Sequence, residues 1–77
     1  MQQVIELLAK ALVDTPDQVT VSELNGEECT VLELRTAPEE TGQVIGKNGH
    51  IAAAFRTLLA AAGGKRHRRY TLEILER

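Results

Sequence analysis

The spacing of apolar residues divides the chain into segments, and the first of these predicts a helix. Over residues 2–13, apolar side chains recur at three- and four-residue intervals, which is typical of a helix with one buried face. They are Val4, Ile5, Leu7, Leu8, Ala11 and Leu12. Asp14-Thr15-Pro16 should end the helix, because a residue before proline is disfavoured in the helical region. We interpret the apolar stripe as part of the core, and a partner-binding helix is the alternative.

The next segment changes to alternation, which predicts strands. Residues 19–24 and 28–36 alternate apolar and polar side chains, and Asn25-Gly26 separates the two runs. This dipeptide between alternating runs is a strong hairpin signal. We expect one face of the hairpin to be buried under helices and the other, which carries Glu33 and Arg35, to face water.

The middle of the chain predicts a short helix that leads into a pair of glycines. Residues 36–39 have the spacing of a capping box, and the helix should run to about Ile45. A glycine at position 42 inside this helix costs roughly 1 kcal/mol relative to alanine. Close packing is the one explanation that the sequence offers for Gly42.

A third helix and a last strand complete the pattern. Residues 50–62 carry apolar side chains at helical spacing, and Gly63-Gly64 is expected to close this helix. The apolar positions are Ile51, Ala54, Phe55, Leu58, Leu59 and Ala62. We assign Phe55 to the core and place Arg56 on a different face. Residues 70–75 alternate again, which predicts a strand.

Length and composition limit the class of protein. The 77 residues predict one small domain over positions 1–77, with little room for a deep enzyme pocket. No apolar run is long enough to span a membrane, and the first residues lack the features of a secretory signal. Cys29 is the only cysteine and cannot form an internal disulfide, so we expect a reducing, cytoplasmic setting.

The net charge of −2 hides a difference between the two halves of the chain. Residues 1–41 contain two basic and nine acidic residues, a net charge of −7. Residues 42–77 contain seven basic and two acidic residues, a net charge of +5. Such an asymmetry indicates a polyanionic partner for the basic half.

The basic half contains the candidate for a binding site, Gly46-Lys47-Asn48-Gly49, which we call the glycine turn. Its two glycines leave the backbone open to a ligand, Lys47 adds a mobile charge, and Asn48 adds an amide. A helix that starts after this turn presents unpaired N–H groups, which suit a phosphate. His50 stands at the start of that helix, where it can contact the same ligand.

The basic run from Lys65 to Arg69 is a second candidate, and two interpretations of it stay open. It is either a solvated surface or a supplementary phosphate patch. His50 and His67 lie 17 residues apart, with no Cys or carboxylate at the spacing of metal ligands. We therefore expect no metal site, and nothing in the sequence predicts a cofactor.

The glycine turn and its flanks resemble a known family. Val44-Ile45-Gly46-Lys47-Asn48-Gly49-His50-Ile51 is similar to the central signature of the KH domain, whose G-x-x-G loop clamps the backbone of about four nucleotides. Residues 41–49 resemble the Thr-Gly-x-Val-Ile-Gly-Lys-x-Gly segment of the small, single-domain bacterial KH proteins of the KhpA-like family. The resemblance covers essentially the whole chain. It implies an α+β, type II KH fold, α-β-β-α-α-β, with a three-stranded sheet backed by three helices.

The resemblance also implies a function, namely binding of single-stranded RNA by a cytoplasmic RNA chaperone or post-transcriptional regulator. It implies a homodimer, or a heterodimer with a second KH-containing protein. The expected RNA-binding residues are Ile45, Gly46, Lys47, Asn48, Gly49, His50, Ile51, Lys65, Arg66, Arg68 and Arg69. The bases are expected on an apolar floor that includes Ile45, Ile51, Leu32 and Leu34. Many relatives should carry Arg where this chain has His50, so its phosphate contact should be weaker at neutral pH or sensitive to pH.

Two other classes of protein compete with this interpretation. An enzyme with a phosphate-binding P-loop is disfavoured, because only three residues separate Gly42 from Gly46 and Asn48 stands where a P-loop has Ser or Thr. No set of catalytic residues is evident, so we expect that the chain is not an enzyme. A protein-interaction module with the KH fold is the alternative.

Single-stranded DNA stays open as a ligand, because a backbone clamp does not read the 2′-hydroxyl group.

Overall fold

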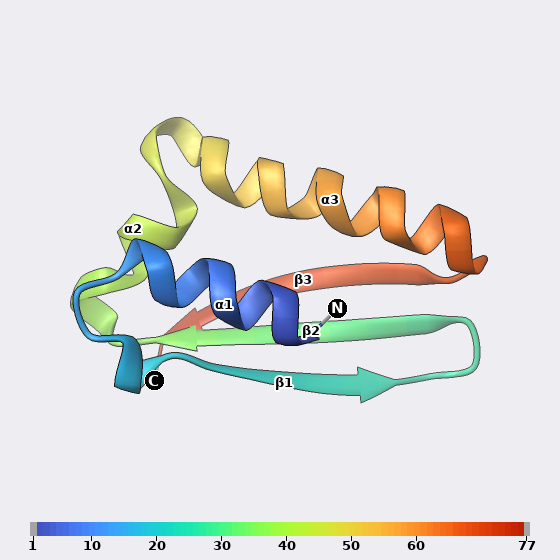
Figure 1. Cartoon of the computed structure of the whole chain (residues 1–77), viewed down its shortest axis with the longest axis horizontal. Coiled ribbons are helices and arrows are strands. Elements are labelled where there is room, and N and C mark those ends of the chain that lie inside the picture. The colour runs from blue at the N-terminus through green and yellow to red at the C-terminus, as the bar shows by residue number, and fades with distance from the viewer. Residues whose placement is uncertain (1, 77) are drawn as a thin grey trace.

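The computed structural model describes residues 2–76 and contains three helices and three strands in the expected order (Figure 1). The elements are α1 (Gln2–Leu12), β1 (Thr20–Asn25), β2 (Cys29–Thr36), α2 (Thr41–Ile45), α3 (His50–Arg66) and β3 (Arg69–Glu76). Short 3₁₀ turns precede β1, α2 and α3. The order α-β-β-α-α-β confirms the predicted α+β, type II KH fold.

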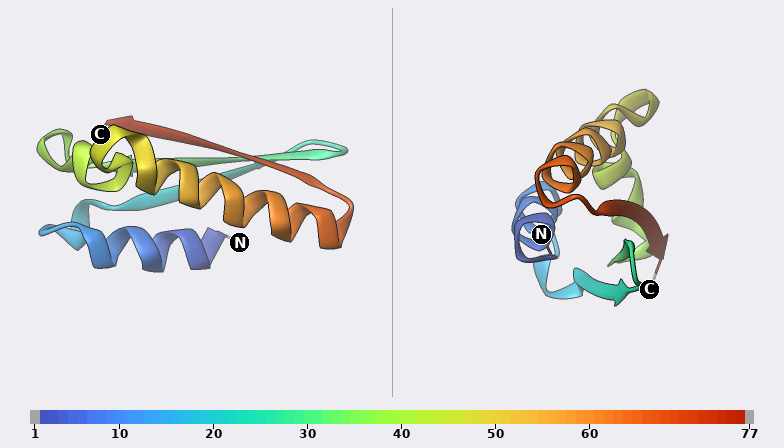
Figure 2. Two further views of the ribbon diagram at one scale, coloured as in Figure 1. Left: turned by 90° about the horizontal axis from the view of Figure 1, so that it is seen from above. Right: turned by 90° about the vertical axis from the view of Figure 1, so that its right-hand side faces the viewer.

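The three strands form one sheet with β2 in the centre. β1 and β2 are antiparallel, as a hairpin requires, whereas β2 and β3 are parallel. The helices lie on one face of this sheet and leave the other face uncovered (Figures 1 and 2). Glu33 and Arg35 of β2 lie on the uncovered face as expected, but they are half-buried because β2 has a neighbouring strand on each side.

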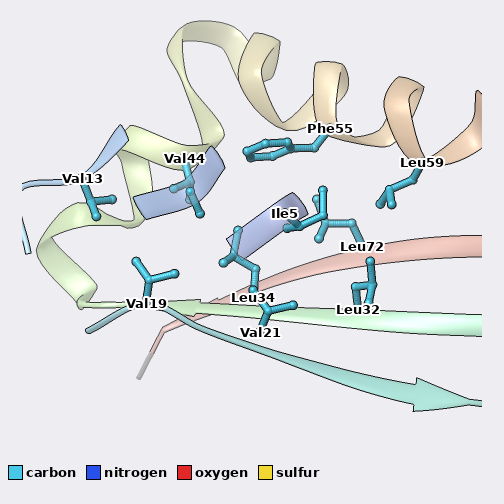
Figure 3. Close-up of a cluster of buried hydrophobic side chains, with 11 residues drawn as sticks. Ile5, Val13, Val19, Val21, Leu32, Leu34, Val44, Phe55, Leu59 and Leu72 are labelled. Atoms are coloured by element: carbon cyan, nitrogen blue, oxygen red, sulfur yellow. The ribbon is translucent and has the colours of Figure 1, made fainter. Parts of the chain in front are cut away.

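The core fills the space between the sheet and the helices (Figure 3). Ile5 of α1, Leu32 and Leu34 of β2, and Val44 of α2 are fully buried there. Phe55 of α3 is 5% exposed, which confirms its assignment to the core. Because α2 contributes Val44 to this cluster, the start of the glycine turn is fixed to the body of the protein.

The apolar stripe predicted for α1 is only partly buried. Ile5 and Ala9 are buried, but Leu7 is 71% exposed and Leu8 is 40% exposed. α1 lies beside α3 in the helical layer (Figure 2), so only one narrow side of it reaches the sheet. The prediction that the whole stripe packs into the core is therefore wrong, and an apolar surface remains on the outside of α1.

The predicted capping box at residues 36–39 does not form. The 3₁₀ turn Pro38–Glu40 begins without a side-chain cap, and the Thr36 hydroxyl lies 3.0 Å from that of Thr41 instead. The close packing proposed for Gly42 is also wrong, since a Cβ there would have no neighbour within 4 Å. The buried carboxylate of Glu40 accepts hydrogen bonds from the N–H groups of Asp14 and Thr15, which ties α2 to the end of α1.

α3 continues through Gly63 and Gly64, and the prediction that these glycines end it is wrong. His67 takes the left-handed position that follows the helix, with φ of 53°. The N–H of Arg68 bonds the Gly63 carbonyl at 2.8 Å, and the N–H of His67 reaches that of Gly64 at 3.5 Å. This is the Schellman pattern with histidine at its usual glycine position. Gly63 is required for another reason, because a Cβ there would collide with the Arg68 carbonyl oxygen.

Candidate nucleic-acid interface

The glycine turn begins at a position that only glycine can occupy. Gly46 has φ of 79° and ψ of 170°, a region closed to residues with a side chain. A Cβ at Gly46 would also lie 2.6 Å from Cγ1 of Ile51 and 2.9 Å from its backbone nitrogen. The half-buried backbone of Gly46 therefore packs directly against the first turn of α3.

The rest of the turn is left-handed. Asn48 and Gly49 have φ of 58° and 74°, and asparagine is among the residues that tolerate this region best. The Gly49 N–H donates to the Gly46 carbonyl at 3.1 Å, which closes the turn. No side chain caps the start of α3. The N-terminus of α3 therefore meets the turn without a side-chain cap, although the His50 N–H is already bonded to the Lys47 carbonyl.

The predicted residues 45–51 lie together around this turn. Lys47, Asn48 and His50 are exposed, whereas Ile51 is half-buried and packs against the core. Ile45 is 37% exposed at the end of α2. A positive charge, an amide and an imidazole thus surround an open backbone, with an apolar side chain on each flank. This combination suits a phosphodiester chain whose bases need an apolar surface.

The strand edge beside α3 adds backbone hydrogen-bonding groups, and it lies next to Arg56, which sequence reasoning did not assign to the site. The Arg69 N–H donates to the Glu28 carbonyl on the β2 side, and backbone groups alternate in direction along a strand. The backbone groups of residues 70, 72 and 74 therefore point away from β2. The guanidinium of Arg56 on α3 donates to the outward Leu72 carbonyl at 3.4 Å. The outward edge of β3 thus lies beside α3, and Arg56 bridges the two elements.

The apolar floor expected from the sequence is partly wrong. Leu32 and Leu34 are 0% exposed, because β2 is the central strand and the helices cover this face of it. They cannot touch a base. Ile45 and Ile51 are accessible, and Ile74 of β3 is half-buried against the core. The available apolar surface therefore comes from helix ends and from the edge strand.

The basic run lies at the opposite end of α3 from the glycine turn (Figure 1), and its members have different surroundings. Arg68 donates to the Thr30 hydroxyl at 2.6 Å and to the backbone carbonyls of Gly26, Glu27 and Cys29. Lys65 lines a depression between α1 and α3, together with Val4 and Leu58. The side chain of Arg66 lies outside the described residues. Arg69 is exposed at the start of β3.

The described residues 2–76 contain no group of three His, Cys, Asp or Glu side chains that could hold a metal ion. They also contain no helix with the length and apolar character needed to cross a membrane.

The fold and the glycine turn together define a class of protein. An α-β-β-α-α-β chain with a G-x-x-G turn between its last two helices is a type II KH domain. The sequence model of the KhpA/KhpB KH domain matches residues 2–74. The chain therefore belongs to the KhpA/KhpB family of KH domains, as the resemblance indicated.

Curated relatives agree with this assignment over their full length. The RNA-binding protein KhpA of Clostridium acetobutylicum is 52% identical over 75 residues, which cover 97% of this chain and 100% of the relative. The RNA-binding protein KhpA of Aquifex aeolicus is 53% identical over 76 residues, covering 99% and 96%. No solved structure matches the chain significantly. Because these relatives are RNA-binding proteins and not enzymes, the expectation that the chain is not an enzyme is confirmed.

Proposed function

We propose that this protein binds single-stranded RNA at the glycine turn and acts in the cytoplasm as a small RNA chaperone or post-transcriptional regulator. The observation that carries the proposal is the conformation of Gly46, which holds an open backbone against Ile51 where no other residue fits. The name of the curated relatives, RNA-binding protein KhpA, supports the same function.

The proposed contact divides the nucleotide chain between two surfaces. Phosphates lie against the backbone of residues 46–49, where Lys47 and the N-terminus of α3 favour negative charge. Bases turn into the groove between α3 and β3, over Ile45, Ile51 and Ile74, and displace Arg56 from the Leu72 carbonyl. Outward backbone groups of β3 then pair with the base edges and supply a limited sequence preference. About four nucleotides fill such a groove.

The experiment is a fluorescence titration of a short, unstructured RNA at two salt concentrations. Lys47→Asp/Asn48→Asp should abolish binding, because two carboxylates then face the phosphates. The matched control is Gln3→Asp/Lys65→Asp, which makes the same change in net charge on exposed positions away from the turn. Helical circular dichroism should be unchanged in both variants. Equal affinity of the two folded variants would refute the clamp.

A second candidate function, which can coexist with the first, is self-association through the outside of α1 and α3. The supporting observation is an apolar surface made by Val4, Leu7, Leu8 and Leu58, of which Leu7 is 71% and Leu58 39% exposed. A monomer in water rarely leaves such side chains together on one face. We propose a second copy of this chain as the occupant, because a two-fold axis can pair one apolar patch with itself.

Sedimentation of the wild type against Leu7→Glu/Leu58→Glu tests this pairing. The wild type should sediment as a dimer and the variant as a folded monomer that still binds RNA. A wild type that is monomeric at all concentrations would exclude the homodimer. The patch would then be tested for pairing with a second KH-containing protein.

A further inference from the structure

An open hollow lies at the end of α3 that is remote from the glycine turn. We call it the distal hollow. Its volume is about 800 Å³, which is within the range of small-ligand sites. It is lined by Glu28, Cys29, Ala60, Gly63, Gly64, His67, Arg68, Arg69 and Tyr70. These residues come from the hairpin end of the sheet, the last turns of α3 and the start of β3.

One wall of the distal hollow is held firmly by Arg68. Its guanidinium bonds the Thr30 hydroxyl and three hairpin carbonyls, so it fixes the hairpin end to the α3–β3 connection. All four acceptors are neutral oxygens. The ion pair found within residues 2–76 joins Lys10 to Glu6 on α1, far from Arg68 in the sequence. Arg68 therefore has no carboxylate partner within these residues. The fixed charge of Arg68 and the exposed Arg69 outweigh Glu28, and the hollow therefore favours an anion.

The distal hollow and Arg56 lie along the same face of α3. Positions 49, 53, 56, 60 and 64 follow one another at three- and four-residue intervals and so lie on one face of α3. Arg56 on this face reaches the outward edge of β3, and Ala60 and Gly64 on the same face line the hollow. Apart from Arg56, these positions carry no side chain larger than a methyl group. The surface between the two ends therefore has room for an extended chain.

We infer that the distal hollow is a second contact for the same single strand of RNA that the glycine turn holds. A nucleotide beyond the four in the groove enters the hollow, with its phosphate toward Arg68 and Arg69 and its base against the ring of Tyr70. Stacking on an aromatic side chain is tolerant of sequence. The hollow therefore extends the length of RNA that one chain binds without adding sequence preference. This inference rests on the proposed function.

The test compares RNA strands of four, six and eight nucleotides in fluorescence anisotropy titrations of the whole chain. A longer strand also offers more registers, about five on eight nucleotides for a site that covers about four, so length dependence alone is not decisive. Arg69→Glu and Tyr70→Leu remove the proposed contacts, and leucine keeps the partial burial of Tyr70. The matched control for charge is Lys65→Glu. Lys65 is one of the residues that the sequence predicts to bind RNA, but it lines the depression facing α1 and takes no part in the contact proposed here.

The wild type should bind eight nucleotides about tenfold more tightly than the number of registers accounts for, which is the size of one base–aromatic contact. Arg69→Glu and Tyr70→Leu should lose this excess and still bind four nucleotides like the wild type. Lys65→Glu should retain it. An affinity that rises only with the number of registers, or an excess that survives both hollow variants, would overturn the inference. A failure of the proposed function gives a different result. If the glycine turn does not bind RNA, the Lys47→Asp/Asn48→Asp variant will bind four nucleotides as well as the wild type does.

Discussion

The two ends of α3 both combine glycines with basic side chains, but these side chains differ in what they contact. At the start of the helix, Lys47 and His50 are exposed beside an open backbone. At the other end, Arg68 makes four hydrogen bonds to the hairpin and holds the fold together. Counting basic residues therefore overstates the charge that is free to move toward a ligand. Arg68 differs from Lys47 and His50 because carbonyl groups of the hairpin lie within hydrogen-bonding distance of its guanidinium.

The glycines of the two ends also differ in purpose. Gly46 is needed for its backbone angles and for its contact with Ile51. Gly63 has an ordinary helical backbone and is needed because β3 returns so close to it that the Arg68 carbonyl occupies the place of a side chain. The left-handed position at this end is taken by His67, which is not a glycine. Substitutions at the two ends of α3 test this comparison.

Gly63→Ala should have the largest effect on stability. Its Cβ would collide with the backbone at Arg68, so the α3–β3 connection must shift, and we expect a loss of about 3 kcal/mol. The control is Gly64→Ala, whose Cβ meets nothing within 4 Å and which should gain up to about 1 kcal/mol from helix propensity. Urea denaturation midpoints measure both. Equal midpoints for the two variants would contradict the close approach at Gly63.

Arg68→Gln should destabilise the fold by about 2 kcal/mol, because several hairpin carbonyls lose a charged donor. Its affinity for a four-nucleotide RNA should be unchanged, since Arg68 lies at the far end of α3 from the glycine turn. Lys65→Gln, an exposed position on the same helix end, should change stability by less than about 0.5 kcal/mol. If Arg68→Gln left the unfolding midpoint alone and weakened four-nucleotide binding, the contrast between the two ends would be reversed.

His67→Gly should stabilise the protein by about 0.5–1 kcal/mol, because a left-handed backbone is strained for a residue with a Cβ. The same substitution at His50, which has ordinary helical angles, should instead cost up to about 1 kcal/mol. Thermal unfolding of the two variants provides the comparison. A His67→Gly variant that unfolds earlier than the wild type would show that the imidazole makes a stabilising contact.

His50→Arg should tighten binding of a four-nucleotide RNA by about threefold at neutral pH, since a permanent charge then faces the phosphates. The slope of log affinity against log salt should steepen by about one. His67→Arg, at the other end of the helix, should leave both quantities unchanged for this short strand. A threefold gain in the His67 variant as well would mean that charge acts at long range rather than at the glycine turn.

Local sequence signals predicted most of the fold. Alternation and Asn25-Gly26 gave the hairpin correctly, and the glycine turn was recognised because Gly46 and Gly49 stand between apolar residues that anchor it. The signals failed where a local pattern was compatible with several surroundings. Gly63-Gly64 resembles a helix end in sequence, but nothing in the sequence reveals that Arg68 returns against Gly63. The stripe on α1 marks apolar side chains without showing how many of them the sheet can cover.

The sequence alone determined the elements, their order and the position of the glycine turn, because these depend on backbone preferences and on neighbours a few residues apart. Tertiary structure decided which basic side chains are free, which leucines are accessible and what the edge of β3 presents to α3. Arg56 and Leu72 lie 16 positions apart, and Arg68 and Gly26 lie 42 apart. Residues so far apart in the sequence come into contact only when the helices pack on the sheet. The distance between them in space is set by the folding of the whole chain and cannot be inferred from the types of the two residues.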